Sequence, residues 1–165
     1  MTVRKIRILG DPVLRTPCEK ITKIDDNVKQ LIQDLIDTTN MEGRAGVAAN
    51  QIGAGLAAFS LNINGEIDYI INPKITKLSK ELQTDIEEGC LSIPEKWFIT
   101  VRAERARCEG IDLDGKKKVI EGDGLLARAL QHECDHLDGF LYIDRLKGTE
   151  KRKMRTELFK NKPLN

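Results

Sequence analysis

The segment QHECDH, residues 131–136, contains both histidines of this 165-residue chain. It matches the pattern His-Glu-x-x-His, and on a helix the i, i+4 spacing places His132 and His136 on one face, with Cβ atoms about 5 to 6 Å apart. Two imidazoles at that separation can chelate one metal ion. Glu133 is rotated by roughly 100° around the helix, where a general base for a water molecule is expected. The segment therefore predicts a helix that carries a hydrolytic metal site.

The residues around this segment predict that the helix is largely buried. It is expected to begin near Leu125 and to run through both histidines to Gly139, a typical C-terminal cap. Its apolar positions are Leu125, Leu126, Ala129, Leu130 and Leu137. Two histidines and a glutamate are costly inside a protein unless they are paired or bound to metal. After the helix, FLYIDRL (residues 140–146) is expected to be extended.

The first forty residues predict irregular chain followed by an amphipathic helix. Residues 3–21 contain the breakers GDP and RTP and are expected to be irregular, with one short strand at most. From Val28 onward, apolar residues recur at i, i+3, i+4, i+7 and i+8. This pattern predicts a helix from Asp26 to about Met41, capped by Asp25 or Asp26.

The central part of the chain has the alternating pattern of strands. Short apolar or alternating runs between residues 46 and 102 predict antiparallel strands, with a hairpin turn at Asn64-Gly65. A second hairpin is expected at Asp114-Gly115. The predicted fold is therefore α+β: antiparallel sheets packed around a buried helix that carries HExxH, with an N-terminal amphipathic helix and a C-terminal basic helix, in a single domain over residues 1–165.

The composition is that of a globular protein without an obvious membrane or nucleic-acid partner. The 27 basic and 26 acidic residues give a net charge of +1, so only a local patch would attract a polyanion. No apolar run approaches the roughly 20 residues of a membrane helix, and the N-terminus does not resemble a secretory signal. A cytoplasmic location is expected. The four cysteines are widely spaced, which favours reduced thiols or a metal ligand over disulfides.

Two further segments contain residues that suit a hydrolytic site. A catalytic mononuclear metal needs a third protein ligand, and Cys90 in EEGCLS is a reasonable donor next to Gly89, although taken alone it fits a buried structural cysteine better. In GVAANQIG, residues 46–53, small residues surround Gln51, whose amide can donate to a developing oxyanion. A tight packing turn explains the same small residues.

The segments GVAANQ, EGCLS and QHECDHLDG, in this order and with these intervals, resemble bacterial peptide deformylase over nearly the whole chain. The resemblance implies an enzyme that removes the N-formyl group from the initiator methionine of nascent polypeptides and releases formate. It implies that Cys90, His132 and His136 are the metal ligands and that Glu133 is the catalytic acid and base. It also implies that the oxyanion donors are the Gln51 side chain and the Leu91 backbone N–H. The expected metal is Fe²⁺, with Zn²⁺, Ni²⁺ or Co²⁺ as alternatives in purified protein, zinc forms being poor catalysts.

The pocket and its supports are expected around these segments. For the methionine side chain we expect Ile86, Leu125, Ala129 and the stem of Arg128, with backbone contacts from Gly46 and Val47; Leu125 and Ala129 are equally well explained as core residues. By the same resemblance, Glu88 and Arg102 form a buried ion pair that braces the Cys90 strand, and Asp135 is a further partner. An ordinary surface ion pair is the alternative.

One residue departs from the family pattern. Where the family usually has glycine, two residues before Gly46, this chain has Arg44. Because arginine disfavours the positive φ that glycine tolerates, Arg44 is expected to change the mouth of the pocket or the backbone of the loop.

The C-terminal segment from Lys147 to Lys162 carries a concentrated positive charge. Seven basic residues against two acidic ones give it a local net charge of +5, beside a thin apolar stripe of Met154, Leu158 and Phe159. As in similar bacterial enzymes, this helix is expected to dock on ribosomal RNA near the nascent-chain exit; a solvated surface helix is the alternative. The protein is otherwise expected to be a monomer that binds N-formylmethionyl peptides and no membrane.

Two other functions are compatible with HExxH. In a zinc peptidase of the thermolysin type, a downstream glutamate such as Glu157 would be the third ligand. In a ribosome-binding or RNA-binding module, a structural zinc site would be closed by a fourth ligand such as Cys108 or Cys134. Glu133 would be dispensable in that second case.

Overall fold

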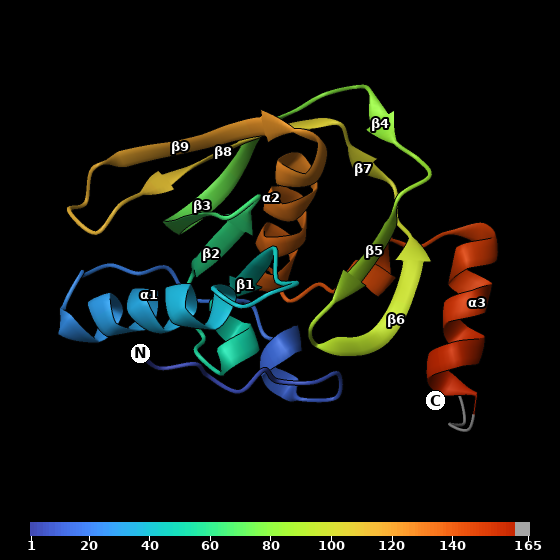
Figure 1. Cartoon of the computed structure of the whole chain (residues 1–165), viewed down its shortest axis with the longest axis horizontal. Coiled ribbons are helices and arrows are strands. Elements are labelled where there is room, and N and C mark those ends of the chain that lie inside the picture. The colour runs from blue at the N-terminus through green and yellow to red at the C-terminus, as the bar shows by residue number, and fades with distance from the viewer. Residues whose placement is uncertain (161–165) are drawn as a thin grey trace.

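The structure is a computed structural model, of which residues 1–160 are described (Figure 1). The α-helices are α1 (Asp26–Thr39), α2 (Gly124–Leu137) and α3 (Gly148–Phe159). The strands are β1 (Gly46–Ala48), β2 (Ala58–Ile63), β3 (Glu66–Leu78), β4 (Leu82–Gln83), β5 (Glu87–Cys90), β6 (Ile93–Ile99), β7 (Arg102–Ala103), β8 (Arg105–Ile111) and β9 (Lys117–Asp123). Short 3-10 helices occupy Pro12–Arg15, Ala49–Ile52 and Tyr142–Arg145. The predicted α+β class is confirmed.

The largest sheet has five antiparallel strands in the order β1-β2-β3-β8-β9. Both predicted hairpins are present within it. Asn64 and Gly65 both have positive φ, 55° and 84°, which is the conformation that a two-residue hairpin turn with the right twist requires. The β8–β9 loop is held by the Asp112 carboxylate, which accepts hydrogen bonds from the backbone N–H groups of Asp114 and Lys116.

Helix α2 lies at the centre of the molecule, between the five-stranded sheet and the antiparallel β5–β6 pair (Figure 1). On the sheet side, its apolar residues Ala127, Leu130 and Leu137 pack in one cluster with strand residues such as Phe59 and Ile70. Burial on both sides leaves few positions of α2 in solvent. Leu125, in the first turn, is an exception at 52% exposed, so the prediction that the helix is buried was wrong at that residue.

Helices α1 and α3 lie at opposite ends of the molecule (Figure 1). The predicted amphipathic helix α1 begins after Asp25, whose carboxylate accepts a hydrogen bond from the Val28 N–H at 3.0 Å, and it ends at Thr39. Its apolar face packs with Val47 and Ile71 of the sheet. Helix α3 ends at Phe159, and the predicted basic residue Lys162 lies outside the described residues.

The prediction that residues 140–146 are extended was wrong. Residues 140–146 include a 3-10 helix, Tyr142–Arg145, because burial of Tyr142 beside Phe98 turns the chain inward.

In the N-terminal segment, Pro12–Arg15 form another 3-10 helix. Pro12 opens it and the Asp11 carboxylate caps it by accepting from the Val13 N–H. The described part of that segment has a single β-bridge, Glu19 to Leu56, and no full strand.

Candidate metal centre and active site

The two helix histidines and a strand cysteine converge on one point. His132 and His136 lie one turn apart on α2, with their Nε2 atoms 3.2 Å apart. Cys90 at the end of β5 places its Sγ atom 3.3 Å from His136 Nε2. All three ligand atoms lie within 4.8 Å of one another. Across residues 1–160, this is the group of acidic, histidine and cysteine side chains that is suited to hold a metal ion.

The separations between these atoms fit a metal ion. A tetrahedral ion with metal–nitrogen bonds of about 2.0 Å and a metal–sulfur bond of about 2.3 Å requires edges of roughly 3.3 Å between nitrogens and 3.6 Å between nitrogen and sulfur. The observed 3.2 Å and 3.3 Å are close to those edges. Three protein ligands leave one position for water or substrate, which is typical of catalytic sites.

A network of buried charges holds the ligands in place. Glu88, two residues before Cys90 and so on the same face of β5, accepts from His132 Nδ1 at 2.5 Å. Arg102 donates two hydrogen bonds to the Glu88 carboxylate, at 3.1 and 2.7 Å, and Arg128 donates a third at 2.6 Å. Glu88 is only 5% exposed. A carboxylate in this position fixes the orientation and tautomer of a ligating histidine.

The network continues to Asp135 on α2. Arg102 Nη1 donates to the Asp135 carboxylate at 2.7 Å, and Arg145 donates two more hydrogen bonds to it. Glu88, Arg102, Arg128 and Asp135 therefore each have a partner of opposite charge, as the cost of desolvation demands. The Arg128 and Arg145 contacts were missed in the sequence, because neither residue belongs to a motif.

The two histidines have pKa values that are shifted in opposite directions. Burial alone would lower the pKa of His132, but hydrogen bonds to Cys90 and Glu88 raise this pKa well above its usual value. Burial and the neighbouring His132 lower the pKa of His136. For Glu88, burial opposes ionisation, yet the hydrogen bonds from His132 and Arg102 lower the pKa below its usual range. The surroundings therefore favour a positive charge on His132 and disfavour one on His136.

Glu133 lies against the segment that contains Gln51. A Cβ atom added to Gly46 would lie 2.8 Å from Glu133 Oε1, so only glycine permits this close approach. Burial raises the pKa of Glu133 to about 7. Its Oε2 atom is buried and has no hydrogen-bond partner among the described residues. A carboxylate of this kind is suited to exchange a proton near neutral pH.

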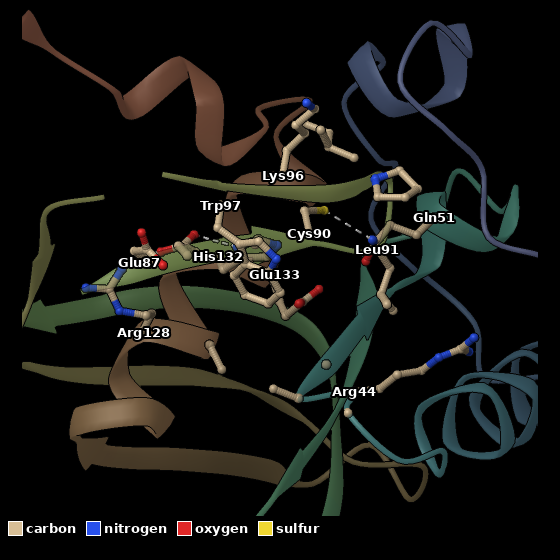
Figure 2. Close-up of a pocket in the computed structure, with 18 of the residues that line it drawn as sticks. Arg44, Gln51, Glu87, Cys90, Leu91, Lys96, Trp97, Arg128, His132 and Glu133 are labelled. Atoms are coloured by element: carbon tan, nitrogen blue, oxygen red, sulfur yellow. Dashed lines mark hydrogen bonds and ion pairs between the residues drawn. The ribbon is translucent and has the colours of Figure 1, made fainter. Parts of the chain in front are cut away.

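The Gln51 amide is fixed within the same site (Figure 2). Its Oε1 accepts from the Ala48 N–H at 2.9 Å, and its Nε2 donates to Ser92 Oγ at 3.1 Å and lies 3.6 Å from Cys90 Sγ. The side chain is 1% exposed, so its orientation is set by these partners. Ser92 was missed in the sequence, although it follows Cys90 in the same segment.

Comparison with known proteins agrees with this geometry. The family model for polypeptide deformylase matches residues 3–152. The chain belongs to the peptide deformylase family. A peptide deformylase from Acidothermus cellulolyticus is 47% identical over 93% of this chain and 84% of that protein. The crystal structure of a peptide deformylase from Thermotoga maritima has a TM-score of 0.84 at 36% identity, covering 90% of this chain and all of the other. A plant peptide deformylase, PDF1B, has a TM-score of 0.88 at 32% identity, with 96% and 88% covered.

The family assignment settles the reaction. The protein is a metal-dependent hydrolase that removes the N-formyl group of the initiator methionine from newly synthesised polypeptides. The HExxH peptidase and the RNA-binding module are therefore not the function of this chain. Glu157 lies on α3 at 4.0 Å from Lys96, and neither Cys108 nor Cys134 joins the group of metal ligands.

A cavity of about 410 Å³ opens beside the deformylase metal centre. Of the residues expected to bind methionine, Gly46, Leu125, Arg128 and Ala129 line it. The backbone contact expected of Val47 and the contact expected of Ile86 remain predictions. Val47 is fully buried with α1, because neighbouring strand residues face opposite sides of β1, and Ile86 precedes β5 and is not among the lining residues.

Trp97 on β6 is a cavity residue that sequence reasoning missed (Figure 2). It is 59% exposed, and its ring covers Gly89, where an added Cβ would lie 2.6 Å from the indole. The sequence signal that was available is the pair of Gly89 and Trp97, a glycine and a large aromatic residue on opposite strands of one hairpin. Gly89 therefore leaves the space that the Trp97 indole occupies.

Arg44 lies between the cavity and the end of α1. Its φ is not positive, because Gly43 takes the left-handed conformation instead, with φ of 80°. The guanidinium donates to the Thr38 carbonyl at 2.7 Å, so the side chain runs from the cavity rim toward the end of α1 (Figure 2). Arg44 lines the cavity, and the predicted change in its mouth or in the loop backbone relative to glycine remains a prediction.

Within residues 1–160, no helix of this deformylase is long and apolar enough to cross a membrane.

Proposed function

We propose that Cys90, His132 and His136 hold the catalytic metal and that Glu133 is the catalytic acid and base. The observation that carries this is the convergence of three ligand atoms beside a buried carboxylate whose Oε2 has no partner among residues 1–160. A divalent metal held there would supply Lewis acidity to the scissile formyl group and to a water molecule.

Glu133 then performs two proton transfers. It takes a proton from the attacking water and returns it to the amine of the departing peptide. Because its pKa is raised to about 7 by burial, the carboxylate both accepts and releases a proton near neutral pH at little cost. The closeness of Gly46 keeps the carboxylate in one place during both steps.

Gln51 and the Leu91 N–H stabilise the negative charge on the formyl oxygen. The Gln51 amide is held by the Ala48 N–H, so its Nε2 atom is directed toward Ser92 and Cys90 before substrate binds. Loss of one such donor typically costs about 10² to 10³ in rate. Leu91 lines the cavity next to Cys90, where its backbone meets the substrate.

The methionine side chain occupies the part of the cavity lined by Leu125, Ala129 and the stem of Arg128. Leu125 is half-exposed at the rim, and Arg128 is fixed by Glu88, Gln83 and the Thr100 carbonyl, so its aliphatic stem forms a rigid wall. Gly46 presents backbone to the substrate. Glu88, Arg102 and Asp135 act by positioning the metal ligands.

Fe²⁺ is the physiological metal in this proposal, with Zn²⁺, Ni²⁺ and Co²⁺ as substitutes. A thiolate with two imidazoles suits all four ions, so the choice is a matter of activity rather than of fit. The deciding experiment is formate release from formyl-Met-Ala-Ser under anaerobic conditions with each metal. We expect the Fe²⁺ form to turn over fastest and the Zn²⁺ form slowest; equal or faster turnover with Zn²⁺ would overturn the assignment of iron.

The proposed setting is the cytoplasm, where a single domain over residues 1–165 acts as a monomer on nascent chains at the ribosome. Basic residues on α3 face solvent, whereas Met154 is buried and Glu150 accepts from the Ile99 N–H, so the helix is docked by one side and charged on the other. A charged face of this kind suits ribosomal RNA. Co-sedimentation of the protein with ribosomes tests whether α3 binds there.

A further inference from the structure

Two cysteines outside the metal site are in contact with each other. Cys108 lies on β8, the fourth strand of the large sheet, and is fully buried. Cys134 lies on α2 and packs against the same apolar cluster. Their Sγ atoms are 4.0 Å apart, and both are free thiols. The metal centre uses neither of them.

The separation of these sulfurs is close to that needed for a covalent bond. A disulfide has an S–S bond of about 2.05 Å, so the two atoms must approach by roughly 2 Å. Rotation of the two side chains and a shift of α2 toward β8 are the two movements that can close this gap. The other free cysteine outside the metal site, Cys18, has no such neighbour among the sulfur contacts of residues 1–160.

An oxidant has a route to one member of the pair. Cys134 is partly exposed and lines a second cavity of about 760 Å³, together with Cys18, Ala57 and Gln131. This second cavity is distinct from the one beside the metal, since Cys134 does not line the latter. A small oxidant therefore reaches Cys134 first, and the buried Cys108 is placed behind it as the resolving thiol.

We propose that Cys108 and Cys134 are a reversible oxidation site that closes into a disulfide and slows deformylation. A peroxide is the oxidant: the Cys134 sulfur attacks its O–O bond, giving a sulfenic acid and one water. The Cys108 sulfur then attacks the Cys134 sulfur and expels the second water. One peroxide is consumed for two thiols, and a dithiol reductant reverses the reaction by exchange.

The disulfide acts on the active site through the helix backbone. Cys134 directly follows Glu133 and lies between His132 and His136, so movement of α2 toward β8 moves the catalytic carboxylate as well. Glu133 has little room, because Gly46 lies against it. A displacement near 1 Å of a catalytic group costs on the order of 10²-fold in rate. This consequence rests on the proposed role of Glu133.

The test uses the nickel-loaded holoenzyme, because nickel does not react with peroxide as ferrous iron does. Stepwise hydrogen peroxide should remove two thiols, lower the intact mass by about 2 Da and yield a linked pair of peptides containing Cys108 and Cys134. Activity on formyl-Met-Ala-Ser should fall together with the thiols and return with dithiothreitol. Nickel content, measured in parallel, should stay constant, which shows that Cys90 remains a ligand.

Variants separate the cross-link from other damage. Cys134→Ser and Cys108→Ala should keep their mass and activity at the same peroxide dose, while the matched control Cys18→Ser should respond like the wild type. If Cys134→Ser is inactivated to the same extent, or if wild-type mass does not change, the proposal is wrong. A disulfide that forms without slowing turnover would overturn its regulatory part. Inactivity of untreated wild type would instead contradict the proposed function, because the mass change reports the cross-link alone.

Discussion

Helices α2 and α3 both carry many ionisable side chains, but they use them differently. In α2, eight of 14 residues are buried, including Arg128, Glu133 and Asp135. In α3, Met154 is the single buried residue of 12. A buried charge must have a specific partner at a specific distance, whereas solvent screens the charges on α3. Individual residues should therefore matter in α2, and the sum of charges should matter in α3.

The largest expected effect comes from Glu133. Glu133→Gln keeps the shape of the side chain but removes its ability to accept a proton, so kcat/KM for formyl-Met-Ala-Ser should fall about 10² to 10⁴-fold. The metal content should be unchanged, because Cys90, His132 and His136 remain. Full activity in this variant would remove Glu133 from the mechanism. Cys90→Ser is the complementary change, which should abolish tight metal binding.

The next effect concerns the network that supports the α2 histidines. Arg102→Met leaves Glu88 and Asp135 with fewer partners, and breaking a buried ion pair in this way costs about 3 to 5 kcal/mol in the free energy of unfolding. Urea denaturation of the apoprotein and of the metal-loaded protein measures this cost. Arg145→Met is the matched control. Arg145 also contacts Asp135, but its side chain is 46% exposed, so its replacement should lower the unfolding free energy by less than about 1 kcal/mol. If Arg102→Met and Arg145→Met lower the unfolding free energy equally, burial of Arg102 does not explain the cost.

Acid should reduce the stabilisation that the Glu88 carboxylate gives to the fold. The pKa of Glu88 is lowered in the folded protein, so this carboxylate stabilises the fold above its unfolded pKa of about 4.3, and the contribution is lost as pH falls toward the folded value. The difference in unfolding free energy between wild type and Glu88→Gln should shrink between about pH 5 and pH 2. A difference that grows with acid would contradict the direction of the shift.

A smaller effect is expected from the charges on α3. The double change Lys151→Glu with Arg155→Glu should weaken co-sedimentation with ribosomes and reduce its dependence on salt, because two phosphate contacts are lost. Turnover of formyl-Met-Ala-Ser should be unchanged. The control Lys151→Arg with Arg155→Lys keeps the charge and should bind normally. Unaltered ribosome binding in the charge-reversed variant would leave α3 as a solvated helix.

The smallest expected effect tests a residue that the peptidase hypothesis made essential. Glu157 on α3 is partly exposed and lies 4.0 Å from Lys96. Glu157→Ala should lower the unfolding free energy by less than about 1 kcal/mol and leave metal binding and deformylation near normal. Loss of metal in this variant would contradict the conclusion that individual charged residues matter in α2 and not in α3.

Local patterns in the sequence account for much of what was predicted. The spacing of Val28 and its apolar neighbours predicted α1, and Asn64-Gly65 predicted the first hairpin, because each depends on backbone preferences over a few residues. FLYIDRL was misread, because nothing local shows that Tyr142 is buried beside Phe98 and Met154. The Arg44 guanidinium donates to the Thr38 carbonyl, a partner that sequence patterns do not reveal.

The sequence by itself determined the class of site, since HExxH, EGCLS and GVAANQ are contiguous motifs with the donors that a hydrolytic metal site requires, and its resemblance to peptide deformylases implied the reaction. Only the tertiary structure decided that Arg128 joins Glu88, that Gly46 lies against Glu133 and that Cys108 contacts Cys134. These pairs are separated by 26 to 87 positions in the chain. Their contacts depend on how α2 packs between the sheet and the β5–β6 pair, and close packing across elements leaves no periodic signal in the sequence.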